Sequence, residues 1–109
     1  MKGFISGLML FIAITGFAQK NAEKAAFKVN GNCTMCKQKI EKAASVNGVS
    51  AAVWNVDSKT LRIKFSPDVI SLDSIQKLIA EIGYDTEKYR ADDSTYSQLH
   101  KCCLYERKK

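Results

Sequence analysis

Along residues 25–90 the hydrophobic pattern switches between a period of two and a period near 3.6, and these switches delimit the predicted elements. Alternating apolar and polar positions predict strands, the last of them weak, at 25–30, 49–56, 60–65 and 84–89. Helical spacing predicts one helix over 36–46, with Ile40 and Ala44 on the same face as Cys36. A second helix is predicted from an N-cap at Ser71 to Gly83, which is placed to end it.

The predicted order is strand, helix, strand, strand, helix, strand. This order is typical of an α+β fold, the ferredoxin-like βαββαβ sandwich, in which two helices cover one face of a four-stranded antiparallel sheet. The domain is expected to span 25–90 and to be followed by a Cys-containing extension over 91–109. Tyr96, Leu99 and Tyr105 give this extension enough apolar surface to pack against the domain.

The first eighteen residues have the layout of a secretory signal peptide. Lys2 precedes an apolar run over 4–17, and the small residues Gly16 and Ala18 predict cleavage after Ala18. A membrane anchor is the alternative, but the run is short for a bilayer span and polar residues follow it at once. The protein is therefore expected to be periplasmic or otherwise exported, with no membrane span after cleavage.

The charge balance argues against a nucleic-acid partner. The formal net charge is +6 at pH 7, and loss of Lys2 with the signal peptide would lower it to +5. This excess is spread along the chain, with no basic block inside the predicted domain. No catalytic triad or carboxylate pair is recognisable either, so the chain is not expected to be an enzyme.

The cysteines lie in two pairs, and the first is the CxxC of "GNCTMC", Cys33 and Cys36. The loop places both thiols at the start of the first predicted helix, where free N–H groups favour thiolates. Two thiolates on one loop suit a soft ion, above all Cu(I), whereas zinc usually takes four ligands. A thiol–disulfide couple and a structural disulfide are the alternatives, although so small a loop constrains little of the unfolded chain.

Residues 25–90 resemble the heavy-metal-associated domain family, which includes copper chaperones, the N-terminal domains of metal-transporting ATPases and periplasmic mercury-binding proteins. The matching segments are "VNGNCTMCKQKIEKA", "NGV", "WNVDSKTLRIKF" and "IQKLIAEIGYD". The resemblance implies that Cys33 and Cys36 bind metal and pass it by thiolate exchange to a metal-transporting ATPase or another metal-accepting protein.

The loop departs from the family pattern. Where the family has Gly-Met-Thr/Ser-Cys, this chain has Gly31-Asn32-Cys33, one residue shorter and without the methionine. Met35 is expected to fill that space, with a weak thioether ligand as the alternative. Tyr84 matches a family aromatic that lies next to the metal loop, where it either shields the site or packs in the core.

The second pair, Cys102 and Cys103, lies in "LHKCCLY" with the only histidine, His100. These three residues are possible additional ligands, for the first ion or for a second one, and free or oxidised thiols are the alternative. The sequence thus predicts an exported Cu(I) chaperone or scavenger. The alternatives are a periplasmic mercuric-ion binding protein, a thiol–disulfide oxidoreductase and a small interaction domain with structural disulfides, and Zn(II) remains a possible cargo.

Overall fold

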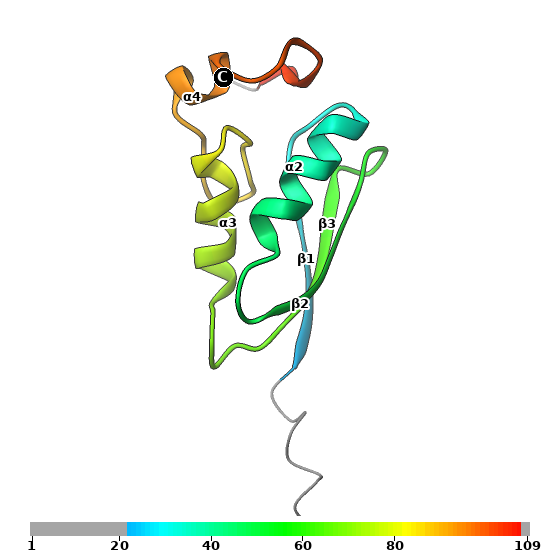
Figure 1. Cartoon of the computed structure of the whole chain (residues 1–109), viewed down its shortest axis with the longest axis vertical. Coiled ribbons are helices and arrows are strands. Elements are labelled where there is room, and N and C mark those ends of the chain that lie inside the picture. The colour runs from blue at the N-terminus through cyan, green and yellow to red at the C-terminus, as the bar shows by residue number, and fades with distance from the viewer. Residues whose placement is uncertain (1–21, 108–109) are drawn as a thin grey trace, which may run out of the picture.

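The computed structural model describes residues 22–107 (Figure 1). Its sheet has three antiparallel strands in the order β1–β3–β2, and helices α2 and α3 lie side by side on one face of it (Figure 1). Two short helical turns follow at the end of the domain where α2 begins (Figure 1). The bounds are β1 Glu23–Lys28, α2 Thr34–Ala44, β2 Val49–Asn55, β3 Thr60–Phe65, α3 Leu72–Glu81, α4 Asp93–Ser97 and the 3-10 turn η3 Lys101–Cys103. The predicted α+β, ferredoxin-like class is confirmed.

The core lies between the sheet and the two long helices. Strand β3 contributes Leu61, Ile63 and Phe65, all buried as their alternation predicts. From β2, Trp54 is 1% exposed and donates its indole N–H to the carbonyl oxygen of Val29 at 3.0 Å. This tryptophan is therefore a core residue with its polar atom satisfied. Helix α2 buries its predicted face of Cys36, Ile40 and Ala44, and α3 buries Ile75 and Ile79.

Helix α3 begins and ends where the sequence predicts. The side chain of Ser71 accepts a hydrogen bond from the backbone N–H of Ser74 at 3.1 Å, which caps the helix. Gly83 has φ +110°, a conformation that favours glycine, and a Cβ at this position would lie 3.0 Å from Leu99. Gly83 thus ends the helix and leaves room for the C-terminal extension.

The predicted fourth strand, 84–89, is reduced to a single antiparallel bridge between Val29 and Thr86. The N–H of Asn30 donates to Asp85 at 2.9 Å, so this segment does run beside the end of β1. The chain then turns back, because Thr86 and Tyr89 hydrogen-bond to one another through both backbone and side-chain groups. The order of a ferredoxin-like sheet is kept, while the outer strand is replaced by a turn.

Helix α2 begins two residues before the predicted start at 36 and ends two residues before 46. Cys33 is its N-cap, with an extended backbone at φ −155° and ψ 174°, and its carbonyl accepts the first helical hydrogen bond from Lys37 at 3.0 Å. This register places Cys36 in the first turn of the helix, one turn beyond Cys33.

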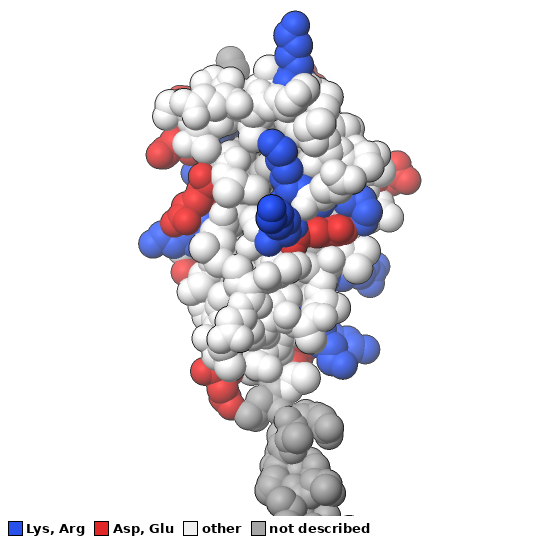
Figure 2. All heavy atoms as spheres, in the orientation of Figure 1, with Lys and Arg blue, Asp and Glu red and all other residues white. Residues whose placement is uncertain are grey.

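Charged side chains are interspersed on the face of the molecule drawn in Figure 2, with acidic groups between the basic ones. Lys37, on α2, does not simply extend into solvent. Its ammonium binds the carboxylate of Glu41 and the carbonyl of Trp54, and Glu41 also accepts the N–H of Trp54 at 2.8 Å. Lys37 therefore helps to fasten α2 to β2, whereas Lys39 and Lys42 are exposed.

The predicted signal peptide, 1–18, lies outside the described residues. Among the helices of 22–107, none combines the length and the apolar character needed to cross a bilayer.

Candidate metal centre

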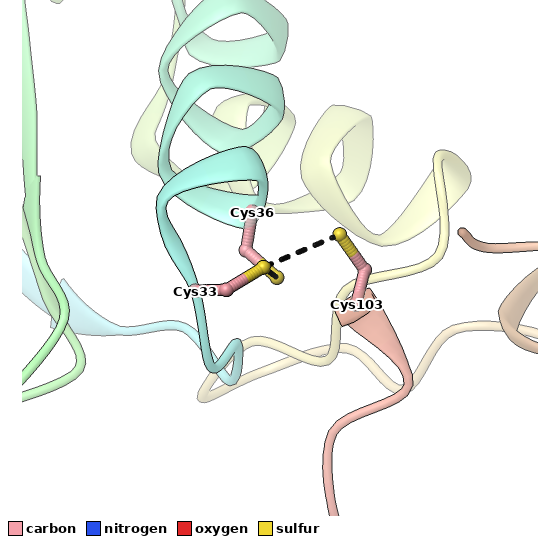
Figure 3. Close-up of side chains that lie close together, drawn as sticks. All are labelled: Cys33, Cys36 and Cys103. Atoms are coloured by element: carbon pink, nitrogen blue, oxygen red, sulfur yellow. Dashed lines mark hydrogen bonds between the residues drawn. The ribbon is translucent and has the colours of Figure 1, made fainter. Parts of the chain in front are cut away.

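Three cysteine sulfurs converge where α2 meets η3 (Figure 3). The sulfur atoms of Cys33, Cys36 and Cys103 all lie within 4.8 Å of one another. Cys33 Sγ is 3.3 Å from Cys36 Sγ and 3.7 Å from Cys103 Sγ. Sulfurs bound to one first-row metal ion at about 2.3 Å would be separated by roughly 4 Å. Small adjustments would therefore let these three sulfurs surround one ion.

The CxxC loop positions its two thiols differently. Cys33 is partly exposed at the N-cap, whereas Cys36 is fully buried in the first turn. The Cys36 sulfur lies 3.2 Å from the amide oxygen of Asn32 and accepts the Asn32 backbone N–H at 3.4 Å. The loop thus wraps around Cys36 and leaves Cys33 at the rim.

The CxxC loop is also supported by contacts of Gly31 with Trp54 and Lys59. A Cβ on Gly31 would lie 3.0 Å from the Trp54 ring and 3.2 Å from Cys36, so any other residue here would require these neighbours to shift. The Lys59 ammonium, from the turn between β2 and β3, donates to the Gly31 carbonyl at 2.6 Å. A rigid support of this kind keeps the two thiols in place before any ion binds.

The C-terminal extension brings Cys103 to the site because Tyr105 anchors it two residues later. The Tyr105 hydroxyl donates to the Gly83 carbonyl at 2.8 Å and accepts the Asp85 N–H at 2.9 Å. Its ring stacks on Tyr84 with centroids 5.8 Å apart and meets Tyr96 edge-on at 5.0 Å. The expectation that the extension packs against the domain is confirmed.

A buried ion pair joins the end of the C-terminal extension to the domain. Arg107 donates through Nε and one terminal nitrogen to both carboxylate oxygens of Asp85, at 2.9 and 2.8 Å. The same guanidinium lies 4.5 Å from the centroid of the Tyr96 ring. These contacts fasten the chain beyond Cys103 to the domain.

The thiols differ in acidity. Partial burial would raise the pKa of Cys33, but hydrogen bonds from the Cys36 backbone N–H and from neighbouring thiols outweigh it and lower the pKa to about 7. Burial raises the pKa of Cys36 to about 11 and also raises that of Cys103. Cys33 is therefore the thiol that reaches the thiolate form most readily at neutral pH.

Tyr84 forms one wall of the site. Its side chain is fully buried, and within the described residues its hydroxyl is the buried side-chain polar atom that lacks a hydrogen-bond partner. Burial, together with the nearby sulfurs of Cys103 and Cys36, raises the pKa of this hydroxyl. A neutral hydroxyl donor close to these sulfurs is well placed to stabilise thiolates once they bind a cation. The unsatisfied hydroxyl thus fits a metal-thiolate centre.

Of the five predicted ligands, three lie together, one lies beside them and one lies apart. Cys33, Cys36 and Cys103 form the converging group, and Cys102 lies beside it, 3.5 Å from the Cys33 sulfur. In the described part of the chain the group contains cysteines alone, because His100 is exposed and precedes η3. All four thiols are free.

Sequence reasoning missed four residues that build this centre: Asn32, Lys59, Asp85 and Arg107. Asn32 stands in the departure from the family loop, which was a usable signal. The Asp85 and Arg107 pairing joins positions 22 residues apart across an irregular segment, and no periodic pattern marks it.

The fold and its motif agree with known proteins. Residues 26–85, more than half of the chain, match the heavy-metal-associated domain family. The copper chaperone CopZ of Staphylococcus epidermidis is 34% identical over 62 residues, which cover 55% of this chain and 91% of CopZ. A copper-exporting P-type ATPase of Staphylococcus saprophyticus is 30% identical over 78% of this chain, which spans only 11% of the ATPase.

Solved structures show the same architecture. The putative copper-ion-binding protein from Bacillus anthracis str. Ames superposes with a TM-score of 0.59 at 27% identity, covering 62% of this chain and all of that one. Oxidized MerP from Ralstonia metallidurans CH34 shares the fold with a TM-score of 0.57 at 24% identity, over 61% of this chain and 94% of MerP. With its βαββα core and its CxxC at the start of α2, this chain belongs to the heavy-metal-associated domain family.

Proposed function

We propose that this protein is an exported Cu(I)-binding protein that holds its cargo through Cys33, Cys36 and Cys103. The convergence of these three sulfurs within 4.8 Å carries the proposal. Thiolates are soft ligands that favour Cu(I), and a set of three with no histidine or carboxylate among them is one ligand short of the usual structural zinc site. The copper proteins among its relatives support the same ion.

The same geometry suggests a carrier that releases its ion to another protein. Cys33 stands partly exposed at the rim of the site, so an incoming thiolate can reach the ion from that side. The proposed acceptor is a metal-transporting ATPase, since copper-exporting ATPases are among the relatives. Export rests on the apolar segment over 4–17 and its cleavage signal.

Two other functions make different predictions. Hg(II) would also bind a cluster of thiolates, and MerP shares the fold. A thiol–disulfide oxidoreductase is favoured by one observation, a rim thiol 3.3 Å from a buried one. It would have to turn over catalytically with a dithiol partner, whereas a metal carrier forms a stoichiometric complex with all three thiols reduced.

The test is an anaerobic titration of the reduced protein with Cu(I), Zn(II) and Hg(II), each in competition with a chelator. We expect the protein to withdraw Cu(I) from its chelator more effectively than it withdraws Zn(II) or Hg(II) from theirs. Cys33→Ser/Cys36→Ser should abolish binding. Cys103→Ser removes one of the three direct ligands, so it should weaken binding by at least the roughly 10- to 100-fold that loss of an outer partner of a ligand costs. Full Cu(I) affinity in the double variant would overturn the proposal.

Transfer and export need separate measurements. Cu(I)-loaded protein mixed with an isolated N-terminal domain of a copper-exporting ATPase should lose its ion to that domain. Residues 1–18 fused to a reporter that is active only after export should yield activity, and Phe11→Arg in the apolar run should abolish it.

A further inference from the structure

Cys102 and Met35 form a second pair of soft ligands beside the three-sulfur group. The Cys102 sulfur is 3.8 Å from the Met35 sulfur, 3.5 Å from Cys33 and 3.9 Å from Cys103. Met35 comes from the first turn of α2 and Cys102 from η3, so two elements far apart in the chain deliver these atoms to one place. Met35 is half-buried and packs against the core.

This pair is arranged as a separate, outer set. The buried Cys36 sulfur contacts Cys33 and Asn32, whereas the exposed Cys102 contacts Cys33, Cys103 and Met35. Cys33 belongs to both sets and lies between them in burial. A thiolate sulfur has enough lone pairs to bridge two soft ions, and the intermediate position of Cys33 suits that role.

We propose that the protein binds a second Cu(I) ion on the outer side of the cluster, held by Cys102 and Met35 with the Cys33 thiolate as a bridge. The inference rests on the proposed function, because Cys33 also holds the inner ion. Thiolate and thioether together select Cu(I), whereas the ligands that zinc takes are thiolates, imidazoles and carboxylates. The outer site is therefore more selective for copper than the inner one.

The charge balance permits the second ion. Binding breaks the S–H bond of Cys102, releases its proton to solvent and forms a copper–sulfur bond, with no change in oxidation state. One positive ion and one new thiolate enter together, so the net charge of the cluster does not change. Because Cys102 is exposed, the outer ion is the one that a partner's thiolate reaches first.

The test counts ions per chain by native mass spectrometry during anaerobic addition of Cu(I) to the reduced protein. Wild type should take two ions, and Cys102→Ser should take one with the affinity of the first ion unchanged. Met35→Leu, which conserves volume, should weaken the second ion at least tenfold in chelator competition. Lys101→Ala, next to Cys102 in η3, is the matched control and should still take two.

A wild type that saturates at one ion, a Cys102→Ser variant that still binds two, or an unchanged second affinity in Met35→Leu would each overturn the outer site. None of these results would bear on the inner site. That site would be contradicted instead if Cys33→Ser/Cys36→Ser still bound the first ion. X-ray absorption should add a copper–copper scattering path on going from one to two ions. Absence of that path would contradict the bridging role of Cys33.

Discussion

Arg107 and Asp85 form a two-point ion pair in which each side chain is only 9% exposed. Asp85 is also the last residue matched to the heavy-metal-associated family, so the pair fastens the extension to the very end of the common domain. The extension in turn supplies Cys103 to the metal centre. The common domain and the extension are therefore packed into one structural unit.

Removal of the Arg107 guanidinium should make the protein much less stable. We expect Arg107→Ala to lower the free energy of unfolding by about 3 kcal/mol, since it leaves a buried carboxylate without its charged partner. Urea denaturation at pH 7 measures this change. Lys88→Ala is the control, because its ion pair with Asp73 is exposed to solvent and should contribute little to stability. Equal effects of the two variants would contradict the buried role of Arg107.

The same pair should make stability depend on pH. Burial would raise the pKa of Asp85, but hydrogen bonds from Arg107 and from the Ala91 N–H outweigh it and hold the pKa below its ordinary value. The stabilisation is therefore complete above the unfolded pKa, about 3.9, and is lost as the pH falls through the folded pKa. The difference in unfolding free energy between wild type and Asp85→Asn should shrink as the pH falls from about 4 through the folded pKa of Asp85, while other carboxylates contribute equally to both proteins. A difference that stays constant with pH would refute this linkage.

Thiol reactivity should follow burial and hydrogen bonding at the site. In the reduced, metal-free protein we expect iodoacetamide to modify Cys33 with a midpoint near pH 7, well before Cys36. Cys102 is exposed, but its pKa is raised, first by its hydrogen bond to Cys33, so it should require a higher pH. Peptide mass mapping after short pulses gives the order. Modification of Cys36 ahead of Cys33 would contradict the arrangement.

Tyr84→Phe should separate stability from metal binding. Because the hydroxyl has no hydrogen-bond partner, its removal should change the unfolding free energy of the metal-free protein by less than about 1 kcal/mol. The same change should weaken Cu(I) binding, since the thiolates lose a nearby donor. Tyr96→Phe is the comparison, because its hydroxyl bonds to the Tyr105 carbonyl and should affect stability more. Unchanged Cu(I) affinity in Tyr84→Phe would exclude a hydrogen bond from its hydroxyl to the bound cluster.

Regular periodicity made most of the fold predictable. The alternation of Leu61, Ile63 and Phe65 and the capping of α3 by Ser71 follow from local physics, and both are observed. The strand predicted over 84–89 was wrong, because the pairing of Thr86 with Tyr89 turns the chain away after one bridge. Alternation alone cannot report such side-chain to backbone competition.

The metal centre was predictable where it is local in sequence. The CxxC spacing placed Cys33 and Cys36 correctly at the start of a helix, but the choice among Cys102, Cys103 and His100 depended on how the extension packs. Tyr105 and Arg107 decide this by burying the chain so that Cys103 points inward and Cys102 lies outside. Those contacts join residues 22 positions apart in the sequence, and no periodic pattern predicts them.

Trp54 is the chain's only tryptophan, and its ring lies against Gly31, at the base of the loop that carries the CxxC. All tryptophan fluorescence therefore originates from a single position directly beneath the metal centre. Emission intensity and wavelength should report loop rearrangement in real time without any attached dye. The protein carries a native optical probe of its own loading, suited to stopped-flow measurements of how fast an ion enters and leaves.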